Sequence, residues 1–174
     1  DRAVLADANQ RLQRIAHRQR PDGEWEFYVT DTWDLTPQAP HDCLDIDNWF
    51  PHGECDPITS VMPDYDGRIW WVTRFGRVGT VTPATGAVAV QRFAGEEIQN
   101  SLSADPDGMY VITDYALYHM VPDADGTPRT VWREAYQRSN QYRYGNINNG
   151  SGSTPTLMDD VLGRKYVAIT DAGD

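Results

Sequence analysis

The 174-residue sequence predicts an all-β fold of the β-propeller type. Three features support this prediction: short β-rich runs that alternate with turn signals, a repeat of about forty residues, and strand segments that are apolar on both faces. The repeats account for about three four-stranded blades, so the propeller is expected to be incomplete. One helix at residues 1–20 is expected to precede a partial propeller domain at residues 21–174.

The helix is predicted from apolar spacing near the N-terminus. Leu5, Leu12 and Ile15 fall at intervals that suit one face of a helix. Acidic residues come early in this segment and arginines come late, which suits the helix dipole. Pro21 and Gly23 would end the helix. We expect it to pack on the propeller or to act as a linker.

The repeat is visible in the spacing of turn glycines. Gly67 and Gly108 end equivalent Asp-x-Asp-Gly turns, 41 residues apart, and Gly86 and Gly126 end the next pair, 40 residues apart. Two apolar runs separated by a break lie between these turns, which predicts hairpins. Related strand signatures stand at FYVTD (27–31), IWWVT (69–73), YVITD (110–114) and YVAITD (166–171).

Strands of this kind need neighbours on both sides, because both of their faces are apolar. A propeller closes with about four to eight blades. The remaining blades are therefore expected from the same precursor, from a second chain or from a symmetry-related copy. Without them, the uncovered sheet faces are expected to include Trp70, Val72, Tyr110 and Ile112.

The charge excludes some partners. Asp and Glu number 26 against 15 Lys and Arg, which gives a net charge of -11. A body this acidic repels phosphate backbones, so no nucleic acid is expected as a partner. No apolar run approaches the ~20 residues of a transmembrane helix, so no membrane span is expected.

Two cysteines, Cys43 and Cys55, flank a short polar loop. A disulfide between them is predicted, and the alternatives are two free thiols or half of a metal site. The disulfide implies an oxidising compartment, so a secreted or periplasmic location is expected.

The segments 82–90 (TPATGAVAV) and 122–132 (PDADGTPRTVW) resemble the blade signature of quinoprotein (PQQ-dehydrogenase)-like propellers. Trp132 stands where that family has a docking tryptophan, whereas Ala89, Val90 and Gln91 depart from the pattern. The resemblance covers roughly residues 58–174 and implies the fold. Binding of PQQ is not supported by the residues present, because the vicinal cysteine pair of quinone-binding alcohol dehydrogenases is absent.

A weaker similarity concerns the start of an inner strand. Asn100 resembles the channel asparagine of gluconolactonase- and strictosidine-synthase-like propellers, which implies a Ca²⁺ ligand. Glu97 or Glu96 could supply further oxygen from the preceding loop. The counterparts Thr59 and Ser153 offer only hydroxyls, and Asn100 could instead cap backbone groups at the strand start.

The insertion at residues 136–152 is a second candidate site. Tyr142, Arg143 and Tyr144 supply stacking faces and donors that suit a carbohydrate or a small anion, although the insertion could equally be an ordered surface loop. Two functions stay open. The first is a secreted propeller module that recognises a small or extended ligand at its channel mouth. The second is an enzyme built on the complete propeller, either a Ca²⁺-dependent hydrolase or lactonase, or a quinone-dependent dehydrogenase.

Overall fold

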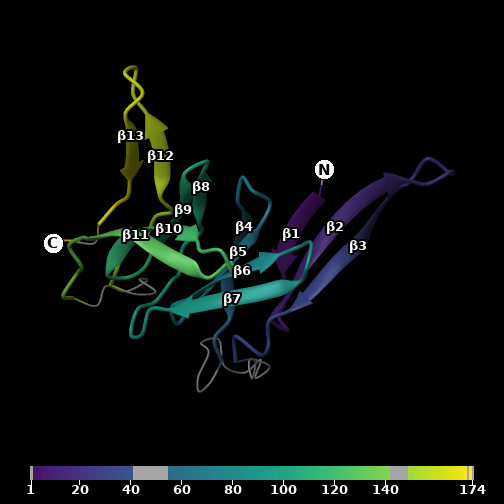
Figure 1. The fold of residues 1–174 in the computed structure, drawn as a ribbon, viewed down its shortest axis with the longest axis horizontal. Helices are drawn as coiled ribbons and strands as arrows, with labels where there is room; N and C mark the ends of the chain where they lie inside the picture. The colour runs from purple at the N-terminus through teal and green to yellow at the C-terminus, as the bar shows by residue number, and fades with distance from the viewer. Residues whose placement is uncertain (1, 41–54, 142–148, 172, 174) are drawn as a thin grey trace.

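The computed structural model describes residues 2–40, 55–141, 149–171 and 173 (Figure 1). These residues form thirteen strands in four antiparallel sheets, and no helix occurs among them. The all-β prediction is therefore confirmed. Within the described ranges, no helix has the length and apolar character needed to cross a membrane.

The prediction of an N-terminal helix is wrong. Residues 2–34 form a three-stranded sheet with the order β1 (Arg2–Ala6), β2 (Arg11–Gln19), β3 (Trp25–Asp34). The apolar residues that suggested one helical face lie on opposite faces of this sheet. Leu12 is fully buried against the rest of the protein, whereas Leu5 lies on the other face and is 37% exposed.

A turn between β1 and β2 explains the error. The Asp7 carboxylate accepts hydrogen bonds from the backbone N–H groups of Asn9 (2.9 Å) and Arg11 (3.0 Å). Gln10 has φ 57°, a left-handed conformation that other turns of this chain give to glycine. Its buried amide donates to the carbonyl of Asp56 at 2.6 Å, which offsets the backbone strain. Because no glycine marks this turn, the sequence does not show it.

Two complete four-stranded sheets follow, and each is a simple meander. Their consecutive strands pair side by side, as the hairpin repeat predicts. The second sheet contains β4 (Ile58–Pro63), β5 (Ile69–Thr73), β6 (Arg77–Thr82) and β7 (Ala87–Arg92). The third contains β8 (Ser103–Asp105), β9 (Gly108–Ile112), β10 (Ala116–Pro122) and β11 (Pro128–Ala135).

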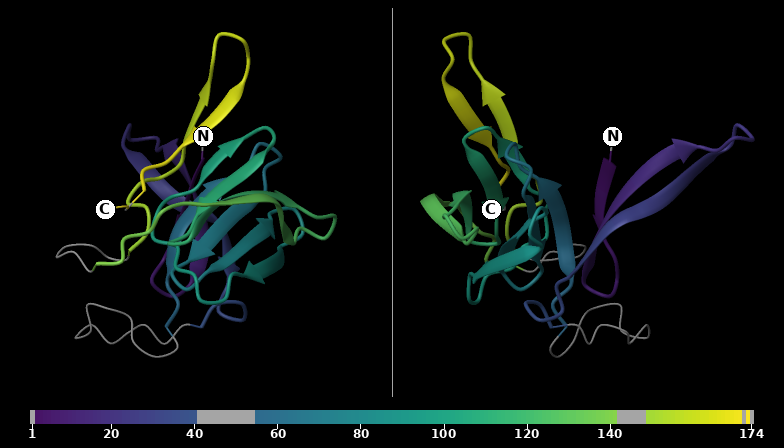
Figure 2. Two further views of the ribbon diagram at one scale, coloured as in Figure 1. Left: turned by 90° about the vertical axis from the view of Figure 1, so that its left-hand side faces the viewer. Right: turned by 45° about the vertical axis from the view of Figure 1, so that its right-hand side comes forward.

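The first three sheets stack face to face, with the core between them (Figure 2). Trp71 packs toward Leu12 and Trp33 of the first sheet, whereas Trp70 packs toward the third sheet. Every residue of β5 is buried, so this strand has apolar neighbours on both sides. Such stacking is how blades pack in β-propellers.

The expectation that Trp70, Val72, Tyr110 and Ile112 lie on uncovered faces is wrong. Their exposures are 0%, 0%, 5% and 1%. The second sheet is covered by both of its neighbours, and the far face of the third sheet packs beneath the residues that follow it.

The fourth sheet is a hairpin, β12 (Thr156–Asp159) and β13 (Lys165–Ala168), which projects from the stack (Figure 1). The four sheets thus have three, four, four and two strands, and the number of blades stays a prediction.

The turns gather at two ends of the stack. One end, here the turn end, holds the β2–β3, β4–β5, β6–β7, β8–β9, β10–β11 and β12–β13 turns, and each of them places a glycine at positive φ. The opposite connector end holds the described parts of the segments that join one sheet to the next, at 35–40, 55–57, 93–102, 136–141 and 149–155.

Candidate functional site

The turn end contains a groove built around Asp105, the last residue of the short strand β8. One carboxylate oxygen of Asp105 accepts hydrogen bonds from the backbone N–H groups of Asp107 (2.8 Å) and Gly108 (3.1 Å), which fixes the turn. The other oxygen accepts from the Tyr110 hydroxyl and from the Lys165 ammonium, both at 3.3 Å. Asp105 thus joins the third sheet to the fourth.

These contacts also shift the pKa values of Asp105, Tyr110 and Lys165. Burial opposes ionisation of Asp105, but the Asp107 backbone N–H and the Lys165 ammonium outweigh it and hold the pKa of Asp105 below its usual value. Burial and the neighbouring Asp105 carboxylate raise the pKa of Tyr110. Hydrogen bonds to Asp107 and Asp105 raise the pKa of Lys165, so its ammonium is protonated and the Asp105 carboxylate is ionised at neutral pH.

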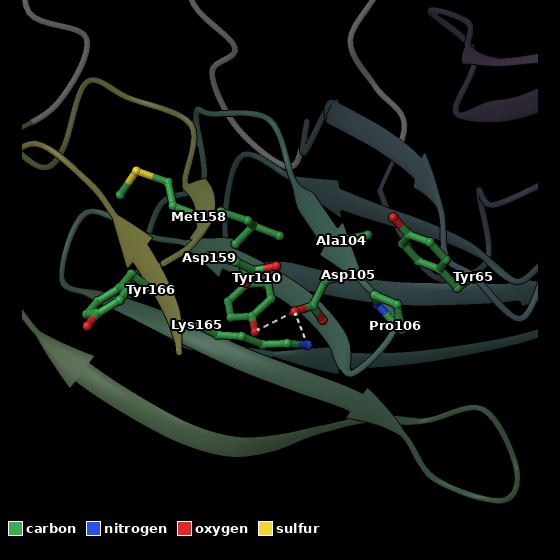
Figure 3. Close-up of a pocket in the computed structure, with 10 residues that line it drawn as sticks. Tyr65, Ala104, Asp105, Pro106, Tyr110, Met158, Asp159, Lys165 and Tyr166 are labelled. Atoms are coloured by element: carbon green, nitrogen blue, oxygen red, sulfur yellow. Dashed lines mark hydrogen bonds and ion pairs between the residues drawn. The ribbon is translucent and has the colours of Figure 1, made fainter. Parts of the chain in front are cut away.

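Two adjoining hollows form the groove. A cavity of about 250 Å³ lies between β8, β9 and the β12–β13 hairpin (Figure 3). A second cavity of about 240 Å³ lies between the β4–β5 and β8–β9 turns. Both are lined by Tyr65, Asp105 and Pro106, so they adjoin at the β8–β9 turn and together reach the turns of three successive sheets. We call this the turn-end groove.

Tyrosine rings form much of its wall. Tyr65 is 69% exposed and Tyr166 is 45% exposed, so both are accessible to a ligand, and the Arg164 guanidinium lies over the Tyr166 ring at 6.0 Å. Tyr110 is buried beneath them and stacks on His119 with 4.7 Å between ring centroids. Trp132 packs on the same face of the third sheet, 5.6 Å from His119. A contact of Trp132 with a neighbouring blade stays a prediction.

The charge of the groove is predominantly negative. Its cations are Arg68 and Lys165, and Lys165 already bridges two carboxylates. The groove therefore offers more hydrogen-bond acceptors than donors. Its carboxylates are those of Asp64, Asp66, Asp105, Asp107 and Asp159.

The residues predicted to bind Ca²⁺ lie at the connector end, where they have other partners. The Asn100 amide donates to the Ser151 carbonyl at 2.8 Å, and the Thr59 hydroxyl donates to the Ile98 carbonyl at 3.0 Å. Glu97 accepts from the Gln99 amide at 3.1 Å. The described parts of the chain bring no three His, Cys, Asp or Glu side chains into a group that could hold a metal ion. Calcium binding stays a prediction.

The predicted loop site lies only partly within the described residues. Tyr142, Arg143 and Tyr144 lie outside them. The described flanks are tied to the third sheet, where the Arg138 guanidinium pairs with the buried Asp114 carboxylate at 2.7 Å. Burial raises the pKa of Asp114, and the Glu97 backbone N–H and Arg138 oppose this effect. Cys43 also lies outside the described residues, whereas Cys55 is buried, so their pairing stays a prediction.

A side-chain contact that recurs in three sheets lies at the connector end, and the sequence analysis did not find it. In each of the last three sheets, the threonine of the strand signature interacts with a side chain exactly seventeen positions earlier in the connector. The spacing between the two partners is the signal that could have revealed it. The pairs are Thr73–Asp56 (2.8 Å), Thr113–Glu96 (2.5 Å) and Thr170–Ser153 (3.1 Å), each with |i−j| of 17.

No protein-family model matches the chain. An uncharacterized protein of Archaeoglobus fulgidus is 41% identical over 122 residues, which is 67% of this chain and 23% of that protein. The chain thus spans less than a quarter of the relative it matches.

Two solved structures align with nearly all of this chain. BamB from Moraxella catarrhalis has a TM-score of 0.49 and 18% identity, over 98% of this chain and 45% of that one. The extracellular domain of BT4673 from B. thetaiotaomicron has a TM-score of 0.45 and 14% identity, over 96% of this chain and 20% of that one.

Proposed function

We propose that the turn-end groove recognises a neutral, hydroxyl-rich ligand, with an oligosaccharide as the best match. The observation that supports this proposal is a pair of adjoining cavities whose walls combine the exposed Tyr65 and Tyr166 with several carboxylates. The groove spans three successive sheets, so it suits an extended ligand rather than a compact one.

The chemistry of the wall favours sugars. The C–H faces of a sugar ring pack on aromatic rings, and Tyr65 and Tyr166 offer such faces at the two sides of Asp105. Sugar hydroxyls donate to carboxylates, and the Asp105 carboxylate is held in place by the backbone N–H groups of its turn. A mainly negative groove repels anions, which argues against phosphorylated or sulfated ligands.

Stacked meanders also support a larger architecture. The strands β4, β8 and β12 begin their sheets and lie next to one another in the stack. In a closed propeller such first strands line the central channel. The turn-end groove would then lie at a channel mouth. In this proposal the complete protein is a secreted or periplasmic β-propeller, and the expected Cys43–Cys55 disulfide supports that location.

Calorimetric titration with a panel of neutral oligosaccharides tests the function. Tyr65→Ala is expected to weaken binding about tenfold, because it removes one stacking face without touching the core. Tyr115→Ala is the matched control, since Tyr115 is 39% exposed but lies in the β9–β10 turn at the connector end. Binding that both variants weaken equally, or no binding by the parent chain, would contradict the proposal.

A further inference from the structure

The first sheet has two unlike faces. Its inner face carries Leu12 and Trp33, which are at most 8% exposed and pack toward the second sheet, together with the buried Ala16. Its outer face carries Phe27 at 77% exposure. The other large exposed residues of this outer face are Trp25 at 59%, Val29 at 49% and Leu5 at 37%.

The outer face also lacks charge along most of its length. Where β2 pairs with β3 from Gln13 to Gln19, the charged residues lie on the inner face and are paired there. Arg14 bonds to Asp31 at 2.7 Å, and Arg18 pairs with Glu26. The outward residues of the same stretch carry no carboxylate, lysine or arginine: Gln13, Ile15, His17, Gln19, Trp25, Phe27, Val29 and Thr32.

A surface with this composition is typical of the centre of an interface. Large contiguous apolar patches are uncommon on monomers. Loss of charged residues, together with enrichment in aromatic residues, marks the buried core of protein contacts. The β2–β3 hairpin extends away from the other sheets, so its outer face is not covered by any described part of the chain (Figure 2).

The packing of the second sheet indicates what covers such a face. The second sheet has apolar residues on both faces, and each face packs on a neighbouring antiparallel sheet of the same chain. The first sheet also has apolar residues on both faces, but only its inner face packs on another sheet. Repeating the same packing step once more places another sheet on the outer face of β1–β3.

We propose that a further antiparallel sheet of the same repeat, belonging to the same polypeptide in the natural protein, covers the outer face of the first sheet. The Archaeoglobus fulgidus relative supports an origin in one polypeptide, because the match occupies only 23% of that protein. A second copy of this chain is disfavoured, because each copy carries a net charge of -11 and two copies repel each other.

Hydroxyl-radical footprinting with mass spectrometry tests this assignment without any mutation. The full-length natural protein and the 174-residue chain are oxidised side by side, and the oxidation rates of Trp25 and Phe27 are compared. Tyr65, which is 69% exposed and lies at the turn end of another sheet, is the internal reference. In the natural protein, Trp25 and Phe27 are expected to oxidise several-fold more slowly relative to Tyr65 than in the 174-residue chain.

Dilution distinguishes the two sources of a covering sheet. Protection that stays constant over a wide range of protein concentration supports a sheet of the same polypeptide. Protection that is lost on dilution would assign the face to a second copy and overturn the proposal. Equal oxidation of Trp25 and Phe27 in both proteins would also overturn it, because the face would then be open to solvent in the natural protein.

Discussion

Removal of the Asp56 carboxylate is expected to be among the most damaging single changes in this chain. Asp56 is 2% exposed and accepts hydrogen bonds from the Thr73 hydroxyl (2.8 Å) and the Phe75 backbone N–H (2.7 Å). It also pairs with the Arg77 guanidinium, whose side chain is 16% exposed. These contacts attach the connector that enters β4 to the β5–β6 turn.

The expected loss of unfolding free energy follows from the groups that would lose the Asp56 carboxylate as their partner. Removing one member of a buried ion pair typically costs about 3–5 kcal/mol. The orphaned hydroxyl and N–H would add to this cost, whereas partial rehydration of Arg77 would reduce it. We therefore expect Asp56→Ala to lower the free energy of unfolding by about 3–5 kcal/mol. Asp56→Asn keeps an acceptor oxygen without the charge and should lose about half as much.

Urea unfolding followed by tryptophan fluorescence measures both variants. Asp123→Ala is the matched control, because Asp123 pairs with Arg129 at 2.8 Å while their side chains are 49% and 54% exposed. Exposed pairs contribute about 0–1 kcal/mol, so this variant should remain close to the parent chain. A loss below about 1 kcal/mol for Asp56→Ala would refute the reasoning, since it would mean that Asp56 does not anchor the connector.

Three further predictions concern single residues. Gln10→Gly relieves the strained φ at this position but also removes the buried hydrogen bond from the Gln10 side-chain amide to the Asp56 carbonyl, so calorimetry should show a lower melting temperature. A higher melting temperature would mean that backbone strain dominates. The arginine and threonine partners of Asp31 lower its pKa from 3.8 to about 2, so the stability it contributes is complete above pH 3.8 and is lost as the pH falls toward 2. The free energy of unfolding of Asp31→Asn should therefore fall less than that of the parent chain over that pH range. An equal fall in both proteins would count against this prediction. Mass spectrometry after alkylation without reduction should find Cys43 and Cys55 unmodified, and labelling of both would rule out their disulfide.

The sequence predicted the second and third sheets because glycines mark their turns. Gly67 and Gly108 stand 41 residues apart, and the intervening apolar runs form the expected hairpins. The first sheet was missed for a physical reason. Its first turn is held by the Asp7 carboxylate and by the buried side chain of Gln10, and neither residue signals a turn as clearly as glycine does.

The candidate groove could not be predicted, because no short motif encodes it. Tyr65, Asp105 and Lys165 belong to three different sheets, and only the stacking brings them together. Asn100, in contrast, was selected from the short segment around it. The structure places the Asn100 amide against the Ser151 carbonyl, which belongs to the connector that precedes β12, and both roles considered for Asn100 stay predictions.

The position of ligand contacts tests the account most directly. Amide chemical shifts of the labelled chain are recorded by NMR during titration with the oligosaccharide that binds best. The account predicts that the largest shifts fall on residues 64–68, 105–108 and 157–166, around the turn-end groove. Shifts concentrated on the connector residues 93–102, 136–141 and 149–155 would contradict it, and would move the binding site to the opposite end of the stack.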